Sequence, residues 1–206
     1  MVTISFPRRH GDICSNFLER DEHAISTSNR GYAMPVRRLV RVEGFDHLIG
    51  FREIQLEYIS WLDLMLNREH GISLTADSTD QLMAEITSNW PLYSGCLGSF
   101  FLAYIGENVG GMAGIKYVSK EICELKRLYV SPHYRRVGIG SSLVERLLIV
   151  ARKLGYSWVR LETLDFMEAA IRLYESYGFV RAPEYEGTEG RGYGIHDHEI
   201  YFSKGL

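Results

Sequence analysis

The 206-residue sequence is poor in cysteine, in net charge and in long apolar runs. Its three cysteines, Cys14, Cys96 and Cys123, lack metal-site spacing, so we expect reduced thiols in a cytoplasmic protein. The net charge of −3 gives no indication of bulk affinity for nucleic acid or for a membrane. No apolar run has the length of a membrane helix. Proline and charged residues interrupt the first residues too early for a signal peptide.

Two common phosphate-binding motifs are also absent. The sequence contains neither G-x-x-x-x-G-K-[ST] nor G-x-G-x-x-G, so a Walker loop and a dinucleotide fingerprint are excluded. Its apolar content of 46% is enough for one domain with a full core. Residues 1–34 are polar and irregular, and we expect an N-terminal extension that is partly ordered at best. The single domain would then cover residues 35–206.

Hydrophobic periodicity and turn residues predict alternating strands and helices over this domain. We expect seven strands, at residues 36–43, 99–105, 109–118, 123–130, 157–163, 179–185 and 195–203. We expect four helices, at about 46–67, 79–89, 141–154 and 166–177. Ser78 and Gln81 form a predicted capping box for the second helix, and Asp165 would cap the fourth. The order β-α-α-β-β-β-α-β-α-β-β is typical of an α/β (α+β) fold with one mixed sheet and helices on both faces.

The stretch 123–154 combines a strand, a loop with two glycines and an amphipathic helix. The first N–H groups of a helix have no internal partner, and the helix dipole adds partial positive charge there. Gly138 and Gly140 let a ligand approach the backbone, and Arg135 and Arg136 add fixed charge. The stretch therefore predicts a phosphate or pyrophosphate site, with simple punctuation between strand and helix as the alternative.

The same residues resemble a known family. The pattern R-x-x-G-x-G at 135–140, just after a strand that ends in Val130, resembles the acyl-CoA-binding motif of the GNAT N-acetyltransferases. Residues 170–179, AIRLYESYGF, are similar to that family's A-I-x-L-Y-x-x-x-G-F segment. The resemblance is specific over residues 121–182. It implies an N-acyltransferase that uses acetyl-CoA or another acyl-CoA, with a small-molecule or peptide amine as acceptor and no metal. A non-catalytic acyl-CoA-binding module is the alternative.

The resemblance also implies which residues hold the donor. Strand-end backbone would pair with the pantetheine amides, and the loop and helix start would bind the pyrophosphate. The donor-binding residues would be Leu128, Tyr129, Val130, Arg135, Arg136, Val137, Gly138, Ile139, Gly140 and Ser141. We expect no nucleic-acid or membrane partner, and a monomer or a homodimer.

Two residues carry the predicted chemistry. Strand alternation puts Glu124 on one face with Leu128 and Val130. The resemblance implies that Glu124 is the general base, directly or through water, whereas a purely structural ion pair is the alternative. Tyr174 matches the family tyrosine that protonates the leaving thiolate, with core packing as its alternative.

Several other residues are weaker candidates. His196 and His198 would lie on one strand face, and without a third ligand we expect a solvated face rather than a metal site. Cys123 would point to the opposite face from Glu124, as a buried thiol. The acidic loop at 184–189 would either attract a cationic amine or only increase solubility.

Overall fold

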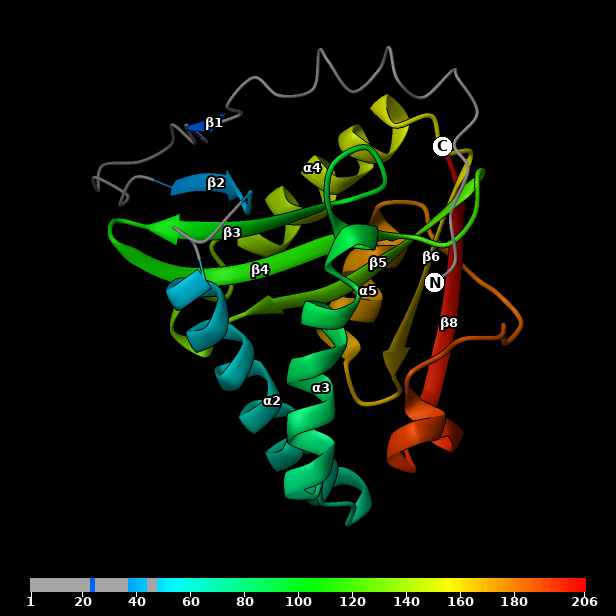
Figure 1. Ribbon diagram of the computed structural model, residues 1–206. Helices are drawn as coiled ribbons and strands as arrows, with labels where there is room; N and C mark the ends of the chain where they lie inside the picture. The colour runs from blue at the N-terminus through cyan, green and yellow to red at the C-terminus, as the bar shows by residue number, and fades with distance from the viewer. Residues whose placement is uncertain (1–22, 25–36, 44–47) are drawn as a thin grey trace.

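The computed structural model describes residues 23–24, 37–43 and 48–206, which form one mixed sheet of eight strands (Figure 1). The strand order is β1-β2-β3-β4-β5-β6-β8-β7. Neighbouring strands are antiparallel, except that β5 and β6 are parallel. The strands are β1 (His23–Ala24), β2 (Arg37–Arg41), β3 (Ser99–Ile105), β4 (Asn108–Tyr117), β5 (Ile122–Val130), β6 (Trp158–Leu164), β7 (Val180–Arg181) and β8 (Glu199–Gly205).

Helices cover both faces of the sheet. Figure 1 shows α2 and α3 on one face, with α4 and α5 on the other. The α-helices are α2 (Leu48–His70), α3 (Ala76–Ser88), α4 (Ile139–Lys153) and α5 (Glu168–Ser176). Short 3-10 turns are η2 (Trp90–Tyr93), η3 (Pro132–Tyr134), η4 (Gly190–Tyr193) and η5 (His196–His198). The predicted mixed sheet with helices on both faces is confirmed, and the predicted extension lies outside the described residues apart from β1.

Alternation along β3 explains why both faces need cover. Phe101 and Ala103 pack into the core under α4, whereas Phe100 and Leu102 pack into the core under α2 and α3. All four residues are buried. A strand that is apolar on both faces must lie between two helical layers, which is why this stretch reads as a nearly continuous apolar run.

Strand β5 contains a bulge. Its pairing with β4 shifts register between Met112 and Gly114, where β5 has one residue more than its neighbour. Arg127 lies in this bulge with a φ of 57°, a left-handed conformation that non-glycine residues seldom adopt. A bulge of this kind interrupts the alternation of side chains between the two faces.

The bulge corrects one sequence prediction. Leu125 packs in the core under α4, so Glu124 and Lys126 on either side of it face the α2–α3 layer. Beyond the bulge, Leu128 and Val130 pack against that same core under α4. The prediction that Glu124 shares a face with Leu128 and Val130 is therefore wrong, because one extra residue reverses the alternation.

Two helix starts also differ from prediction. The Thr75 hydroxyl accepts the backbone N–H of Ser78 at 3.1 Å, so α3 begins earlier and the predicted capping box of Ser78 and Gln81 is wrong. No side chain caps α5, and the Asp165 carboxylate instead contacts two histidines. At α3 two polar side chains compete for the cap, and the sequence pattern does not rank them, whereas at α5 long-range contacts engage the predicted cap.

The last strands are shorter than predicted. Of the strand expected over 179–185, only the two residues of β7 form, because Pro183 has no N–H with which to continue the ladder. The strand expected from 195 begins at Glu199, and the preceding histidines lie in the η5 turn. Cys123 is free and buried as predicted, whereas the expectation of a reduced thiol is wrong for Cys96, which is disulfide-bonded.

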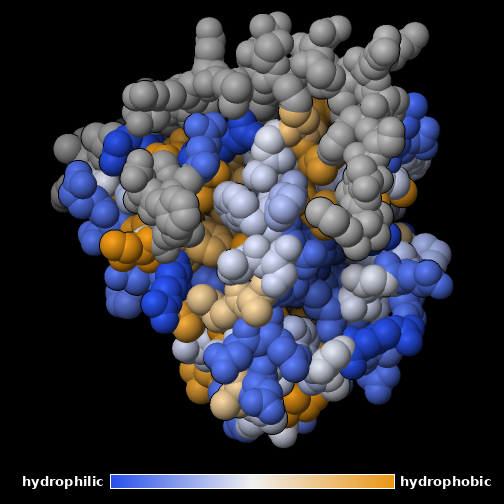
Figure 2. All heavy atoms as spheres, in the orientation of Figure 1, coloured by the Kyte–Doolittle hydropathy of each residue, from blue (hydrophilic) through white to orange (hydrophobic). Residues whose placement is uncertain are grey.

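The surface over α2 and α3 is mixed in character. Figure 2 shows apolar residues scattered among hydrophilic ones on this face. Ile49 and Leu64 on α2 are exposed apolar residues. Among the described helices, none combines the length and the apolar content that crossing a membrane requires.

Candidate active site

The site is built on the divergence of β5 and β6. These strands pair only through the first three residues of β5, Ile122–Glu124, and then separate toward their C-terminal ends (Figure 1). We call this opening the fork. Beyond Glu124, the edge of β5 that faces β6 therefore has backbone groups free for a ligand. A cavity of about 1020 Å³ extends through the fork and reaches α2, the start of α4 and α5. This volume lies at the upper end of the range for cavities that bind small molecules.

The start of α4 forms one end of the cavity. Gly138 precedes the helix with a φ of 89°, a conformation that glycine adopts without steric cost. The first turn leaves the N–H groups of Ile139, Gly140 and Ser141 without intrahelical partners. A Cβ on Gly140 would lie 3.3 Å from Leu173 of α5, so this glycine also permits close packing of the two helices. These features suit a phosphate group at the helix start.

The two predicted arginines differ in their surroundings. Arg135 donates from Nε to the Val130 carbonyl at 2.9 Å, and its guanidinium lies 4.9 Å from the centre of the Trp61 ring. It therefore joins the loop to β5 and α2. Arg136 has a φ of 64° and lines the cavity. Of the predicted donor-binding residues, Val137 alone does not line the cavity.

Tyr174 lines the cavity from α5. Its side chain is buried, and its ring packs against Phe179 and Phe202 with centroid distances of 5.8 and 6.2 Å. Burial raises the pKa of Tyr174 above its ordinary value, so the hydroxyl keeps its proton at neutral pH. Tyr177, the second tyrosine of the motif, donates instead to the Ser141 carbonyl at 3.0 Å and ties α5 to α4.

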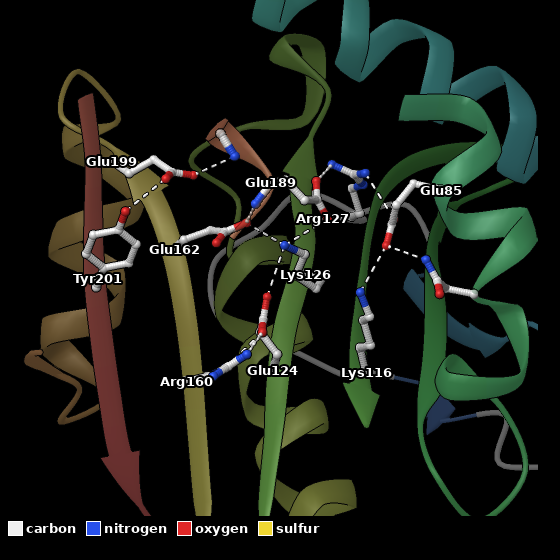
Figure 3. A network of polar contacts seen from close by, with 12 residues as sticks. Glu85, Lys116, Glu124, Lys126, Arg127, Arg160, Glu162, Glu189, Glu199 and Tyr201 are labelled. Carbon is white, nitrogen blue, oxygen red and sulfur yellow. Dashed lines mark hydrogen bonds and ion pairs between the residues drawn. The ribbon is translucent and has the colours of Figure 1, made fainter. Parts of the chain in front are cut away.

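A buried network of charges surrounds the fork (Figure 3). Lys126 lies within 3.0 Å of carboxylate oxygens of Glu124, Glu162 and Glu189. Burial opposes the charge on Lys126, but these carboxylates together hold its pKa well above the ordinary value. The lysine therefore stays protonated, and its three partners compete for one cation.

The network continues toward α3 through the bulge. Arg127 pairs with Glu189 at 2.8 Å and with Glu85 of α3 at 3.2 Å. Lys116 on β4 also pairs with Glu85, at 3.1 Å. Burial would raise the pKa of Glu189, but Arg127 and Lys126 outweigh it and lower that pKa. The carboxylate of Glu189 is therefore ionised and holds the loop before β8 against the centre of the sheet.

Glu124 sits at the closed end of the fork. One of its oxygens lies 3.0 Å from Lys126, and the other accepts from Arg160 at 2.9 Å. Its side chain is 4% exposed, and Glu124 is not among the residues that line the cavity. Both of its oxygens are thus held by cations, which is the structural alternative considered from the sequence, with Arg160 in place of Arg127.

Sequence reasoning did not single out Glu162, Glu85 or the role of Glu189. Glu162 lines the cavity from β6, and Glu189 reaches it from a loop that had no predicted structure. The strand pattern contained one signal, since Glu162 is a carboxylate between the apolar residues Leu161 and Leu164 of a central strand. Such a residue needs a buried partner.

A second polar cluster joins three distant segments. Asp165 accepts from His70 at 2.8 Å and lies 3.3 Å from His198, so one carboxylate bridges two imidazoles. The ligand atoms of the three residues all lie within 4.8 Å of one another. The imidazole rings stack at 3.5 Å with an interplanar angle of 17°, so a metal in the plane of both rings would require one ring to turn. His196 and His198 do not lie on one strand face as predicted, because both belong to the η5 turn.

Comparisons with known proteins agree with this geometry. A model of the acetyltransferase (GNAT) family matches residues 62–179. An uncharacterized N-acetyltransferase of Schizosaccharomyces pombe is 34% identical over 120 residues, which cover 57% of this chain and 72% of that protein. The thialysine N-epsilon-acetyltransferase of Bos taurus is 33% identical over 118 residues, which cover 53% of this chain and 69% of that protein.

Solved structures share the fold at low sequence identity. The PaiA N-acetyltransferase of Thermoplasma acidophilum, in complex with coenzyme A, has a TM-score of 0.60 and 16% identity, covering 82% of this chain and 99% of that chain. An acetyltransferase of Streptococcus agalactiae has a TM-score of 0.60 and 18% identity, covering 82% and 98%. Because the family model spans more than half of the sequence, the chain belongs to the acetyltransferase (GNAT) family and is an N-acetyltransferase.

Proposed function

We propose that the protein transfers an acyl group from acyl-CoA, with acetyl-CoA the expected donor, to a primary amine by direct attack in a ternary complex. The observation that carries this proposal is a cavity that joins the start of α4 to the face of the sheet under α2 through the fork. Donor and acceptor would enter from the two ends of this cavity and meet where β5 and β6 separate. Holding both reactants in one site supplies much of the rate enhancement of such a transfer.

Donor binding would use backbone more than side chains. The N–H groups from Val137 to Ser141 would receive the pyrophosphate, with Arg136 beside them. The unpaired edge of β5 at Leu128–Val130 would pair with the pantetheine amides, as a strand pairs with an added neighbour. The same residues would thereby direct the thioester into the fork.

The reacting groups would be stabilised from β5 and α5. A backbone N–H near Leu128 or Tyr129 would donate to the oxyanion that forms on the thioester carbonyl. The protonated hydroxyl of Tyr174 would donate to the departing thiolate. Its burial and its place in the cavity wall support this role.

The amine must be neutral when it attacks, so a carboxylate has to take its proton. The family resemblance implies Glu124 for this role, directly or through water, and that assignment stays a prediction. Glu124 would also position Lys126 and Arg160, because each of these side chains contacts one of its carboxylate oxygens.

The acceptor would be a small-molecule or peptide amine. One relative acts on thialysine, as its name states, and a small amine with a cationic side group is therefore the first acceptor to try. We also propose that the protein works in the cytoplasm without nucleic acid, as a monomer or a homodimer. The alternative function is a non-catalytic acyl-CoA-binding module. This alternative is favoured by the ion pairs of Glu124, because Lys126 and Arg160 occupy both of its carboxylate oxygens.

Thermal unfolding with equal concentrations of CoA, acetyl-CoA, ATP and NAD tests the donor assignment. A ligand that binds only the folded state must raise the midpoint. We expect CoA and acetyl-CoA to raise it and NAD to leave it unchanged, and equal shifts with all four would contradict the proposal. Acetyl transfer to thialysine would separate an enzyme from a binding module. Tyr174→Phe should lower kcat by about 100-fold or more while CoA still raises the midpoint.

A further inference from the structure

The cluster of His70, Asp165 and His198 joins the ends of three segments that are far apart in the sequence. His70 is the last residue of α2, Asp165 is the first residue after β6, and His198 is the last residue of η5. The backbone also takes part, because the Asp165 N–H donates to the His198 carbonyl at 3.0 Å. The fold therefore fixes two of the three residues against each other before their side chains meet.

The three side chains have the donor atoms and the spacing of a metal site. Two imidazoles and one carboxylate are ligands that Zn²⁺ accepts, and a tetrahedral ion with bonds of about 2.0–2.2 Å holds its ligand atoms about 3.3–3.6 Å apart. One Asp165 oxygen lies 2.8 Å from His70 Nε2, and the other lies 3.3 Å from His198 Nδ1. The three ligand atoms all lie within 4.8 Å of one another, and among the described residues no other such group has this spacing.

The surroundings of the cluster favour a cation. Helix α2 ends at His70, and the helix dipole places partial negative charge at a C-terminus. Within the described part of the chain, Asp165 has no lysine or arginine as an ion-pair partner. Its carboxylate also leaves α5 without a side-chain cap. The one anionic group of the cluster is thus shared between two imidazoles, each of which has a lone pair to offer in its neutral form.

One imidazole must turn to complete the site. The two rings stack at 3.5 Å with an interplanar angle of 17°, so one ion cannot lie in both ring planes. His70 is held by the shorter contact with Asp165 and packs against Phe166, and its side chain is 16% exposed. His198 has the longer contact and is 29% exposed. Because the terminal torsion of histidine has a broad range, turning His198 is the smaller change.

We infer that His70, Asp165 and His198 bind one divalent transition-metal ion, with Zn²⁺ the expected occupant and water as the fourth ligand. The ion replaces the two contacts between nitrogen and carboxylate oxygen. Each imidazole gives the lone pair of one ring nitrogen to the metal and keeps its proton on the other nitrogen. The exposure of the cluster gives the ion and the water molecule access from solvent.

The site would act as a structural clasp beside the cavity. None of the three ligands lines the cavity, but each has a sequence neighbour that does: Glu69, Phe166 and Glu199. A metal bound at the cluster would therefore hold α2, the β6–α5 connection and the start of β8 together from outside the cavity. The inference goes beyond the proposed acyl transfer and does not depend on it, because metal binding is measured without substrate.

The test titrates the full chain, after treatment with EDTA and removal of the chelator, with Zn²⁺ in a calorimeter. We expect one Zn²⁺ per chain. The unfolding midpoint should rise by about 5–10 °C at a free Zn²⁺ concentration of about 100 times Kd, and EDTA should reverse the rise. Mg²⁺ should leave the midpoint unchanged, because it prefers oxygen ligands.

Matched glutamine variants locate the site. His70→Gln and His198→Gln should each weaken Zn²⁺ binding by at least the factor of about 10–100 that the loss of an outer-shell partner costs. His196→Gln is the control, because His196 lies in the same η5 turn but contacts Glu184 and Glu199 instead of Asp165. This control should bind Zn²⁺ as the parent does.

Three results would overturn the inference. The parent could show neither heat nor a midpoint change with Zn²⁺. His70→Gln and His198→Gln could keep the parent affinity, or His196→Gln could lose as much as they do, and either would mean an adventitious ion only. Co²⁺ absorption makes the test independent of how the variants fold. Co²⁺ bound to the parent should give visible bands that one equivalent of Zn²⁺ removes, whereas the unchanged spectrum of Co²⁺ in buffer would overturn the site.

Discussion

The replacement of Lys126 by methionine removes the cation that three carboxylates share. Breaking a buried ion pair by removing one partner costs about 3–5 kcal/mol in free energy of unfolding. Glu124 keeps Arg160 and Glu189 keeps Arg127, so the unpaired charge falls on Glu162 alone. We therefore expect a loss near the low end of that range, about 3 kcal/mol at neutral pH.

The loss should depend on pH, because Glu162 can escape it by binding a proton. Its pKa is already raised in the native protein, and the removal of Lys126 raises it further. A carboxylate whose folded pKa exceeds its unfolded value contributes stability below the unfolded pKa, and this is lost as pH rises through the folded pKa. The Lys126→Met variant should therefore lose more stability at about pH 8 than at about pH 5, measured by urea unfolding.

Two further variants make this reasoning refutable. Lys126→Met combined with Glu162→Gln should recover most of the loss, because removing both partners of a buried pair is far less costly than removing one. Lys116→Met is the control, since its partner Glu85 keeps Arg127 and is left with a cation. An equal loss at both pH values, without recovery in the double variant, would refute the proposed sharing of Lys126.

The start of α4, Asp165 and Cys123 give three further predictions. Gly138→Ala should cost about 1–2 kcal/mol in stability because of its positive φ and should weaken the CoA-induced thermal shift. Gly187→Ala is the control, because Gly187 has a φ of +87° in a loop outside the cavity, so this variant should lose stability but keep its CoA shift. A normal CoA-induced shift in Gly138→Ala would contradict the assignment of the α4 start as the CoA site. Burial alone would raise the pKa of Asp165, but hydrogen bonds from two histidines lower it. Its contribution to stability is therefore present above the ordinary pKa of about 3.9 and is lost as pH falls. Asp165→Asn should flatten this acid-side loss, and superimposable unfolding free energies of the two proteins against pH would contradict it. Burial raises the pKa of Cys123 to about 12, so iodoacetamide should alkylate this thiol in urea but not in the native protein. Intact mass measures the alkylation, and rapid labelling of the native protein would refute the burial of Cys123.

Much of the fold was predictable from local patterns. Strands β3, β4, β5 and β6 lie within two residues of their predicted bounds, because alternation and bounding turns define them strongly. The loop and helix start at Gly138 and Gly140 were predictable because glycines at a strand–helix junction have few other uses. These local signals predict residues that line the cavity at the start of α4.

The charged network beside β6 was not predictable in the same way. The bulge at Arg127 depends on pairing with β4, and no residue within β5 itself marks it. Glu189 comes from a loop with several glutamates, and only its long-range partners distinguish it from Glu184, which pairs on the surface with Arg191. Such contacts join residues about 60 positions apart, beyond the reach of any periodicity.

The long connection between Glu189 and the centre of the sheet has a consequence for folding. Lys126 and Arg127 leave the ribosome well before Glu189, so a chain that ends before Glu189 would bury two cations without the anion that they share. We therefore expect the central strands to remain incompletely folded until the C-terminal segment docks. Folding of the described domain should accordingly appear as one cooperative event, with docking of the segment from Glu189 onward as its last step.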